Sequence, residues 1–172
     1  MSTVAVTSGL GALPSRFRRE RLLIVGYGDV GQRMARNLLT GPGAQRLRVL
    51  ALTSQAERVG SLRAQGVTPL VGNLDHAATL RRLSGLATRV VHLAPPPGEG
   101  GGGAAWWRDP RTVALARALR LRSLPVSLVY ASTSGVYGDC AGALVAETRP
   151  VAPGTPRAQR RVNAERAVRH LG

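Results

Sequence analysis

The feature that most constrains the fold is residues 22–39, which read LLIVGYGDVGQRMARNLL. The segment opens with an apolar run, continues with the pattern Gly26-x-Gly28-x-x-Gly31, and ends with apolar residues at helical spacing, so it predicts a strand, a tight turn and a helix. Gly26 permits the turn, Gly28 leaves room for a pyrophosphate beside the backbone, and Gly31 lets the helix pack on its strand. Because the helix N-terminus directs free N–H groups at phosphates, the segment predicts a dinucleotide site. A glycine-rich turn without a ligand is the alternative.

The chain has 172 residues, of which 44% are hydrophobic, and this length predicts one domain. Residues 21–172 are expected to form that domain, after a flexible leader at residues 1–20 that lacks the pattern of a signal peptide. No apolar run is long enough for a transmembrane helix. The single cysteine, Cys140, has no partner for an internal disulfide, and no Cys or His spacing predicts a metal site. We therefore expect a cytoplasmic protein that binds neither a metal nor a membrane.

The net charge of +15 raises the question of a nucleic-acid partner. All 24 basic residues are arginines, and they are scattered through the predicted helices and loops. Aromatic residues make up only 3% of the chain, too few for a platform on which bases stack. Specific nucleic-acid binding is therefore not expected. It stays a third hypothesis, which predicts an affinity that falls steeply with added salt.

Four further apolar runs predict strands, and segments of helical period separate them. The strands are expected over residues 47–52, 67–71, 88–94 and 125–130. After the helix of the opening segment, further helices are expected over residues 55–65, 75–83, 110–122 and 156–170. Pro69 indicates an edge position for the third strand. The alternation predicts an α/β fold: a Rossmann-type, doubly wound parallel sheet of about five strands with helices on both faces. Ligands bind such sheets at the carboxyl ends of the strands, where strand order reverses.

Several local signals lie between these elements. Ser54 and Asp109 are predicted to cap the helices that follow them. The glycine-rich residues 98–105 predict a loop, either a lid over a ligand or a tolerated low-complexity insertion. The two tryptophans at 106–107 either pack against a substrate domain or cap the sheet, and two such rings in a row rarely both become buried.

Four segments, in this order along the chain, resemble the short-chain dehydrogenase/reductase superfamily, in particular its atypical and extended branch of NAD-dependent epimerase/dehydratase-like proteins. They are residues 26–31 (GYGDVG), 72–75 (GNLD), 92–94 (HLA) and 132–139 (STSGVYGD). The resemblance covers most of the chain after Glu20. Members of the family continue into a sixth strand and a small substrate domain, so the chain resembles a member truncated at its C-terminus. We then expect an exposed flank on the fifth strand that self-associates or is covered by a partner.

The resemblance implies which residues contact the cofactor. These residues belong to residues 26–31, called the glycine segment below, and to the loops after the second, third and fourth strands. They are Gly26, Tyr27, Gly28, Asp29, Val30, Gly31, Thr53, Arg58, Asn73, Leu74, Ala94 and Pro95. The resemblance also implies that Thr133 faces the nicotinamide and hydrogen-bonds a carbonyl or hydroxyl of the substrate.

Two departures from the family pattern concern the cofactor. NAD-preferring members carry an acidic residue at the end of the second strand that binds the ribose 2′-OH, whereas this chain has Thr53 and Ser54 there. The missing carboxylate favours NADP over NAD, and Arg58 stands about one helical turn away. Asn73 replaces the family's usual Asp, and an amide still hydrogen-bonds adenine.

A third departure concerns proton transfer. The family uses Tyr-x-x-x-Lys on the helix after the fifth strand, and alignment on residues 164–165 (AE) places Arg157 at the Tyr position and Arg161 at the Lys position. Arg161 still binds ribose hydroxyls and supplies positive charge, but Arg157 stays protonated and is no general acid. A substitute acid would be Tyr137 or Tyr130.

Two other reactive residue types lie near the expected site. His92 is predicted to be a core histidine with its nitrogens satisfied rather than a catalytic base. Cys140 is predicted to be a small buried residue rather than a nucleophile.

The sequence therefore predicts an NAD(P)-binding oxidoreductase or epimerase-like protein that acts on a sugar-nucleotide-like or other small hydroxyl or carbonyl substrate, with NADP or NAD as cofactor. Thr133, Tyr137 and Arg161 are its candidate catalytic residues. The alternative is a non-catalytic NAD(P)-binding sensor or scaffold that has lost the Tyr-Lys pair.

Overall fold

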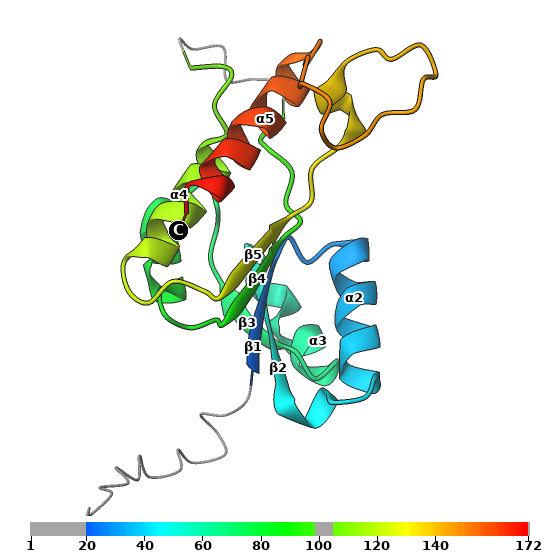
Figure 1. Cartoon of the computed structure of the whole chain (residues 1–172). Coiled ribbons are helices and arrows are strands. Elements are labelled where there is room, and N and C mark those ends of the chain that lie inside the picture. Colours follow the sequence, from blue (N-terminus) through cyan, green and yellow to red (C-terminus); the bar gives the residue numbers. More distant parts are fainter. Residues whose placement is uncertain (1–19, 99–104, 172) are drawn as a thin grey trace, which may run out of the picture.

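The centre of the computed structural model, which describes residues 20–98 and 105–171, is a five-stranded parallel sheet (Figure 1). Its strands are β1 (Glu20–Val25), β2 (Leu47–Thr53), β3 (Thr68–Val71), β4 (Arg89–His92) and β5 (Ser127–Tyr130). They are arranged in the order β3-β2-β1-β4-β5, so strand order reverses beside β1. The predicted α/β fold with a Rossmann-type doubly wound sheet is confirmed. Most of the predicted leader and residues 99–104 of the glycine-rich loop lie outside the described residues.

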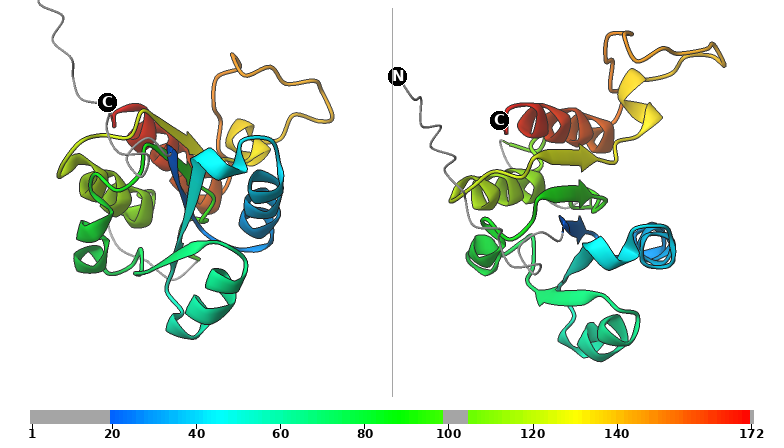
Figure 2. Two further views of the ribbon diagram at one scale, coloured as in Figure 1. Left: turned by 90° about the horizontal axis from the view of Figure 1, so that it is seen from below. Right: turned by 60° about the horizontal axis from the view of Figure 1, so that its bottom comes forward.

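Helices lie on both faces of this sheet (Figures 1 and 2). One face carries α2 (Asp29–Thr40) and α3 (Val59–Ala64). The other carries α4 (Pro110–Arg120), α5 (Pro156–Arg169) and the 3₁₀ helix η3 (Ala77–Leu83). Shorter 3₁₀ helices are η1 (Ala44–Arg46), η2 (Ala56–Arg58) and η4 (Ser134–Tyr137).

The apolar core consists of two clusters, one on each face of the sheet. Because side chains alternate along a strand, β1 contributes Leu23 and Val25 to the cluster under α4 and η3, and Leu22 and Ile24 to the cluster under α2 and α3. All four side chains are at most 6% exposed. The sheet is therefore buried on both sides at β1, which is consistent with the apolar run that precedes the glycine segment.

The two edge strands differ in how they are covered. β3 forms one edge, which confirms the expectation from Pro69. β5 forms the other edge, and its Val129 pairs in register with Val91 of β4. Val91 is 9% exposed, whereas Val129 is 58% exposed, so the apolar cover of the α2 face ends before β5. Val126, just before β5, is also exposed.

Some local predictions differ from the structure. Ser54 caps no helix: the Thr53 hydroxyl accepts a hydrogen bond from the Gln55 backbone N–H, and the predicted helix begins as the 3₁₀ helix η2 before α3 continues it. Gly66, with φ of +77°, follows its end. Residues 77–83 form a 3₁₀ helix rather than an α-helix. In agreement with the expectation for two adjacent rings, the tryptophans at 106–107 are both exposed, so neither belongs to the core.

Candidate functional site

The glycine segment forms a tight connection between β1 and α2. Gly26 has φ of +92°, and a Cβ atom there would lie 2.4 Å from the backbone nitrogen of Ala94. The Gly28 N–H donates to the Gly26 carbonyl at 2.9 Å, and α2 begins at the next residue. A Cβ atom on Gly31 would lie 3.2 Å from Cγ2 of Ile24, so α2 packs closely on β1. A Cβ atom on Gly28 would meet nothing within 4 Å among the described residues, which leaves the space above this backbone open.

That open space belongs to a cleft of about 550 Å³ at the carboxyl ends of β1 to β4. Every residue that we expect to contact the cofactor lines this cleft, from Gly26 through Pro95. The cleft is also lined by residues outside the expected set of cofactor contacts, namely Leu52, Ser54, Gln55, Gly72, Asp75, Leu93 and Arg111.

One end of the cleft lies beside the end of β2. Arg58, from η2, reaches across to the glycine segment and donates from Nη2 to the Tyr27 carbonyl at 3.1 Å. The Tyr27 side chain is buried, and its hydroxyl donates to Oε1 of Gln65 at 3.3 Å. Burial raises the pKa of Tyr27, and the nearby Arg58 opposes this shift. Arg58 is thus the positively charged side chain at this end of the cleft, where Thr53 stands in place of an acidic residue.

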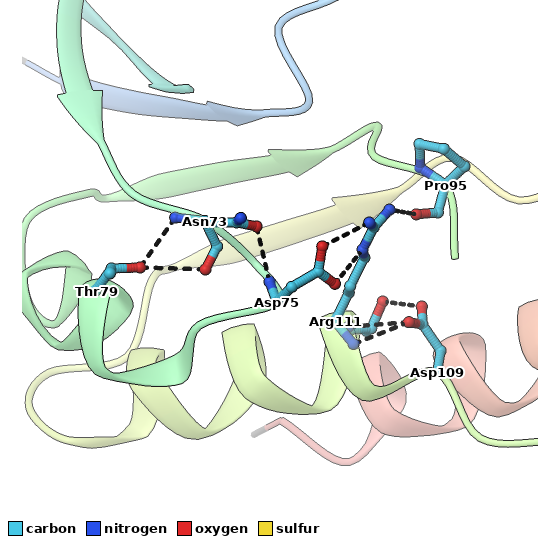
Figure 3. A network of polar contacts seen from close by, with 7 residues as sticks. Asn73, Asp75, Thr79, Pro95, Asp109 and Arg111 are labelled. Atoms are coloured by element: carbon cyan, nitrogen blue, oxygen red, sulfur yellow. Dashed lines mark hydrogen bonds and ion pairs between the residues drawn. The ribbon is translucent and has the colours of Figure 1, made fainter. Parts of the chain in front are cut away.

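The opposite wall carries a polar network that joins three segments (Figure 3). Arg111, at the start of α4, donates from Nε and Nη2 to the two carboxylate oxygens of Asp75, each at 2.7 Å. Its Nη1 donates to the Pro95 carbonyl at 3.4 Å. Oδ1 of Asn73 accepts the backbone N–H of Asp75 at 2.9 Å. Hydrogen bonding to Arg111 lowers the pKa of Asp75, so this wall holds an ionised pair at neutral pH.

The three candidate catalytic residues do not line the cleft. Thr133 is exposed and accepts the Gly135 N–H at 3.4 Å, which makes it the cap of η4. Tyr137 ends η4 and is half-buried. Arg161 is only 8% exposed, and its Nη1 donates to the Tyr130 hydroxyl at 3.1 Å and to the Ala131 carbonyl. The structure thus groups Arg161 with Tyr130 rather than with the glycine segment.

Arg157, at the family's Tyr position, is exposed on the first turn of α5. Tyr130 is the phenol nearest to Arg161, and the guanidinium lies 5.6 Å from the centre of its ring. Burial raises the pKa of Tyr130, against the opposing charge of Arg161. A phenol with a raised pKa is protonated at neutral pH. Tyr130 is therefore a protonated group beside a cation, as a substitute acid would require, but it lies outside the cleft.

A buried chain of polar groups lies behind Tyr130. The Thr112 hydroxyl donates to the Asp109 carboxylate at 2.6 Å, so its oxygen accepts from Nε2 of His92 at 2.8 Å. Burial lowers the pKa of His92 to about 4, and the nearby charge of Arg161 also lowers this pKa. The Val25 backbone has a smaller effect that raises it. Nδ1 of His92 has no hydrogen-bond partner among the described residues. The prediction of a core histidine is thus confirmed for the burial of the ring and for Nε2, which has a hydrogen-bond partner. It is wrong for Nδ1, which was expected to have one too.

One smaller expectation also needs correction. Cys140 is half-buried rather than fully buried. Elsewhere near the end of β5, Glu165 of α5 accepts a hydrogen bond from the Ser132 hydroxyl. This contact has no local sequence signal, because Ser132 and Glu165 meet only through the packing of α5 beside the loop after β5.

No cluster of three or more potential metal ligands occurs within residues 20–98 and 105–171. In the same part of the chain, none of the helices has the length and apolar character needed to cross a bilayer.

Comparison with known proteins bears on this geometry. Residues 22–94 match the family model of the TrkA-N domain, a Rossmann-type NAD-binding domain. No curated protein sequence matches the chain. Solved structures with similar folds include UDP-glucuronic acid 4-epimerase from Bacillus cereus in complex with UDP-glucuronic acid and NAD, with 20% identity and a TM-score of 0.66 over 88% of this chain.

A short-chain dehydrogenase/reductase superfamily protein from Agrobacterium tumefaciens with bound NAD has 22% identity and a TM-score of 0.66 over 87% of this chain. The chain shares the fold of these NAD-binding proteins. A functionally unknown conserved protein from Silicibacter pomeroyi has 26% identity and a TM-score of 0.65 over 88% of this chain. The chain spans 52%, 44% and 49% of the three structures, in the order given. The fold that the sequence resemblance implies is confirmed by these structural neighbours.

Proposed function

We propose that this chain binds NAD or NADP in the cleft at the carboxyl ends of β1 to β4. The observation that carries the proposal is that all the cofactor contacts implied by the sequence resemblance line one cleft. That agreement has weight because these residues come from four separate loops, spread over residues 26–95. The fold, which is shared with structures that hold NAD, supports the same ligand.

The bound cofactor has an expected orientation along the cleft. The pyrophosphate lies against Gly26, Gly28 and the start of α2, where backbone N–H groups favour an anion. The adenosine ribose lies beside Thr53 and Arg58. Because no carboxylate at the end of β2 repels a 2′-phosphate and Arg58 offers it a positive charge, NADP is favoured over NAD.

The adenine then lies beside Asn73 and Leu74, and Ala94 with Pro95 lies along the cofactor. In this orientation Thr133 would be the residue that faces the nicotinamide. When bound, the nicotinamide supplies hydride transfer. Residues 21–172 form the cofactor domain in this proposal, with residues 1–20 as a leader and the cytoplasm as its compartment.

The first candidate function for a chain that binds this cofactor is redox or epimerase chemistry on a sugar-nucleotide-like or other small hydroxyl or carbonyl substrate. Thr133 would hydrogen-bond the reacting oxygen of the substrate, and Tyr137 would supply the proton. Arg161 would supply positive charge near the ribose. The support for this use is the fold of the epimerase structure, which spans about twice the length of this chain.

The second candidate is a non-catalytic NAD(P)-binding sensor or scaffold. It is favoured by the surroundings of two arginines: Arg157 is exposed, and Arg161 is occupied by Tyr130 and the Ala131 carbonyl. An arginine side chain at either position supplies a cation but is no general acid.

Titration of the full chain with NADH and NADPH, followed by the melting temperature and by calorimetry, tests binding. A ligand at one hundred times its Kd stabilises the folded chain by about 2.7 kcal/mol, which is easily seen as a thermal shift. We expect NADPH to bind more tightly, and Arg58→Gln to lower affinity for NADPH more than for NADH. No shift with either nucleotide at millimolar concentration would refute the proposal.

Hydride exchange separates the two uses. The chain is incubated with deuterium-labelled NADPH and a panel of carbonyl compounds, and the label in the products is measured by mass spectrometry. Transfer to a carbonyl compound supports the enzyme, and tight binding without transfer supports the sensor.

A further inference from the structure

Arg111 is the residue through which α4 reaches the cleft. It lines the cleft together with residues of the β-strand loops, and its side chain is 27% exposed. No other residue of α4 lines this cleft. The side chain therefore belongs to the cleft wall rather than to the helix surface.

The guanidinium of Arg111 is held in a fixed plane. Its Nε and Nη2 form a paired contact with both oxygens of Asp75 at 2.7 Å, and its Nη1 donates to the Pro95 carbonyl at 3.4 Å (Figure 3). Bidentate pairs of this kind fix the orientation of both partners. The guanidinium thus directs N–H donors at the protein along two of its edges. Its flat face remains for contact with a ligand.

The ion pair also decides which part of a dinucleotide this group suits. Asp75 offsets the positive charge of Arg111, so the pair is a poor anchor for phosphate compared with the glycine segment and Arg58. A guanidinium plane stacks well on aromatic rings. The neighbours of the pair in the cleft wall are neutral, Asn73, Leu74, Ala94 and Pro95. This end of the cleft is therefore suited to a flat uncharged ring.

We infer that Arg111 stacks its guanidinium on the adenine of the bound dinucleotide, and that Asp75 and the Pro95 carbonyl hold it in the stacking plane. The inference rests on the proposed cofactor site and deepens it. It assigns recognition of the base to a residue of α4, whereas the sequence resemblance assigns it to the loop after β3. Arg111 is then a specificity-determining residue for ligands that carry a purine.

Binding of ADP, which carries the base, and of reduced nicotinamide mononucleotide, which does not, tests the inference. Arg111→Lys keeps a positive charge beside Asp75 but lacks the planar group. We expect this variant and Arg111→Ala to lower affinity for ADP and NADH by roughly tenfold, the effect expected for loss of one stacked base. Affinity for reduced nicotinamide mononucleotide should stay within twofold of the native value. Asp75→Asn should weaken ADP binding in the same direction.

Arg117→Lys is the matched control, because Arg117 is exposed on the same helix and does not line the cleft. Native affinity for ADP in Arg111→Lys overturns the inference while leaving the proposed function intact. An equal loss for ADP and for reduced nicotinamide mononucleotide overturns it too, because that pattern indicates a distorted cleft. Failure of the native chain to bind NADH, NADPH and ADP overturns both proposals together.

Discussion

Gly26 and Gly28 are two residues apart in one motif, but their surroundings differ. Gly26 combines φ of +92° with a backbone neighbour at 2.4 Å from any added Cβ. Gly28 has φ of −84°, which every residue type adopts, and open space above it. The first glycine is therefore required by the fold. The second is required only if a ligand approaches.

Substitution by alanine should separate these two requirements. Gly26→Ala should destabilise the chain by at least about 2 kcal/mol, since the backbone at Ala94 must move and the left-handed conformation is strained. Gly28→Ala should cost less than about 1 kcal/mol, as expected at a helix N-cap, but should weaken NADPH binding by about tenfold or more. Denaturant unfolding and calorimetry measure the two effects. Native affinity in a well-folded Gly28→Ala would contradict the placement of the pyrophosphate.

The hydrogen-bond directions around His92 follow from one charge. A carboxylate only accepts, so Asp109 takes the Thr112 proton, and Thr112 must then accept from Nε2 of His92. The neutral ring thus carries its proton on Nε2. Protonating Nδ1 as well would place a positive charge in a fully buried site close to Arg161.

This burial predicts how stability depends on pH. Because the pKa of His92 is about 4 in the folded chain and about 6.5 in the unfolded chain, the unfolded state binds the proton first as pH falls. Stability should be unaffected by this group above pH 6.5. It should fall by about 3 kcal/mol as pH decreases from 6.5 to 4.

Urea unfolding across this pH range, for the native chain and for His92→Gln, isolates the contribution of His92. The variant should lack the loss, whereas His170→Gln, which removes an exposed histidine, should keep it. Parallel curves for the native chain and His92→Gln would show that His92 does not titrate in this window.

At the scale of elements, α4 is fixed by its first turn. Asp109 is 1% exposed and accepts from the backbone N–H groups of Arg111 and Thr112, at 3.0 and 3.3 Å, as well as from the Thr112 hydroxyl. Its own N–H donates to Oδ1 of Asn163 on α5 at 2.9 Å. The cap therefore sets the direction of α4 relative to α5 and holds Arg111 at the cleft.

Removing this cap should cost more than removing an ordinary one. Asp109→Ala leaves three donors without their acceptor, two of them buried, and we expect a loss of about 3 kcal/mol. Thr155→Ala at the start of α5 loses one exposed cap to Ala158 and should cost about 1 kcal/mol. Thermal unfolding compares the two variants. Equal losses would show that the buried network around Asp109 adds nothing to the cap.

Elements with local signals could be predicted from the sequence, whereas contacts between distant segments could not. Asp109 followed by Pro110 predicts the start of α4 because a cap and a proline act within one turn. At Ser54 the same kind of signal is wrong, because the Thr53 hydroxyl takes the Gln55 N–H instead. The glycine segment identified the cleft. Arg111 carried no signal, since its partner Asp75 is 36 positions away in the sequence.

The surroundings of the candidate catalytic residues were harder to predict for a similar reason. Alignment places Arg161 at a known position, but the direction of its side chain depends on Tyr130 and on the Ala131 carbonyl. These contacts form only when α5 packs beside β5. Residue type at an aligned position therefore says less about function here than the packing around it.

At the scale of the whole molecule, the exposed apolar side of β5 and the net charge of +15 have opposite effects on association. Val129 on this edge strand and Val126 just before it are 58% and 83% exposed, and unpaired strand edges favour pairing with another chain. The positive charge keeps copies apart at low ionic strength. The chain should therefore self-associate more strongly as salt is added.

Sedimentation at low and high salt tests this expectation. Val129→Arg should weaken self-association by roughly tenfold, because it places a charge on the exposed edge strand. Leu144→Arg, on the loop that extends from the sheet beyond η4, should not (Figure 2). A monodisperse monomer at all salt concentrations would contradict the prediction. Binding to nucleic acid has the opposite salt dependence, so one salt series also distinguishes the third hypothesis.

The two apolar clusters of the core are separated by the sheet itself, and this separation has a consequence for local opening. The glycine segment rests on the cluster under α2, whereas Arg111 is carried by α4 on the other cluster. We expect each cluster of the free chain to open on its own, so that its amides exchange hydrogen with solvent independently. A dinucleotide that contacts both walls of the cleft would couple the local opening of one cluster to that of the other. Amides of α2 and α4 would then exchange at a common, slower rate.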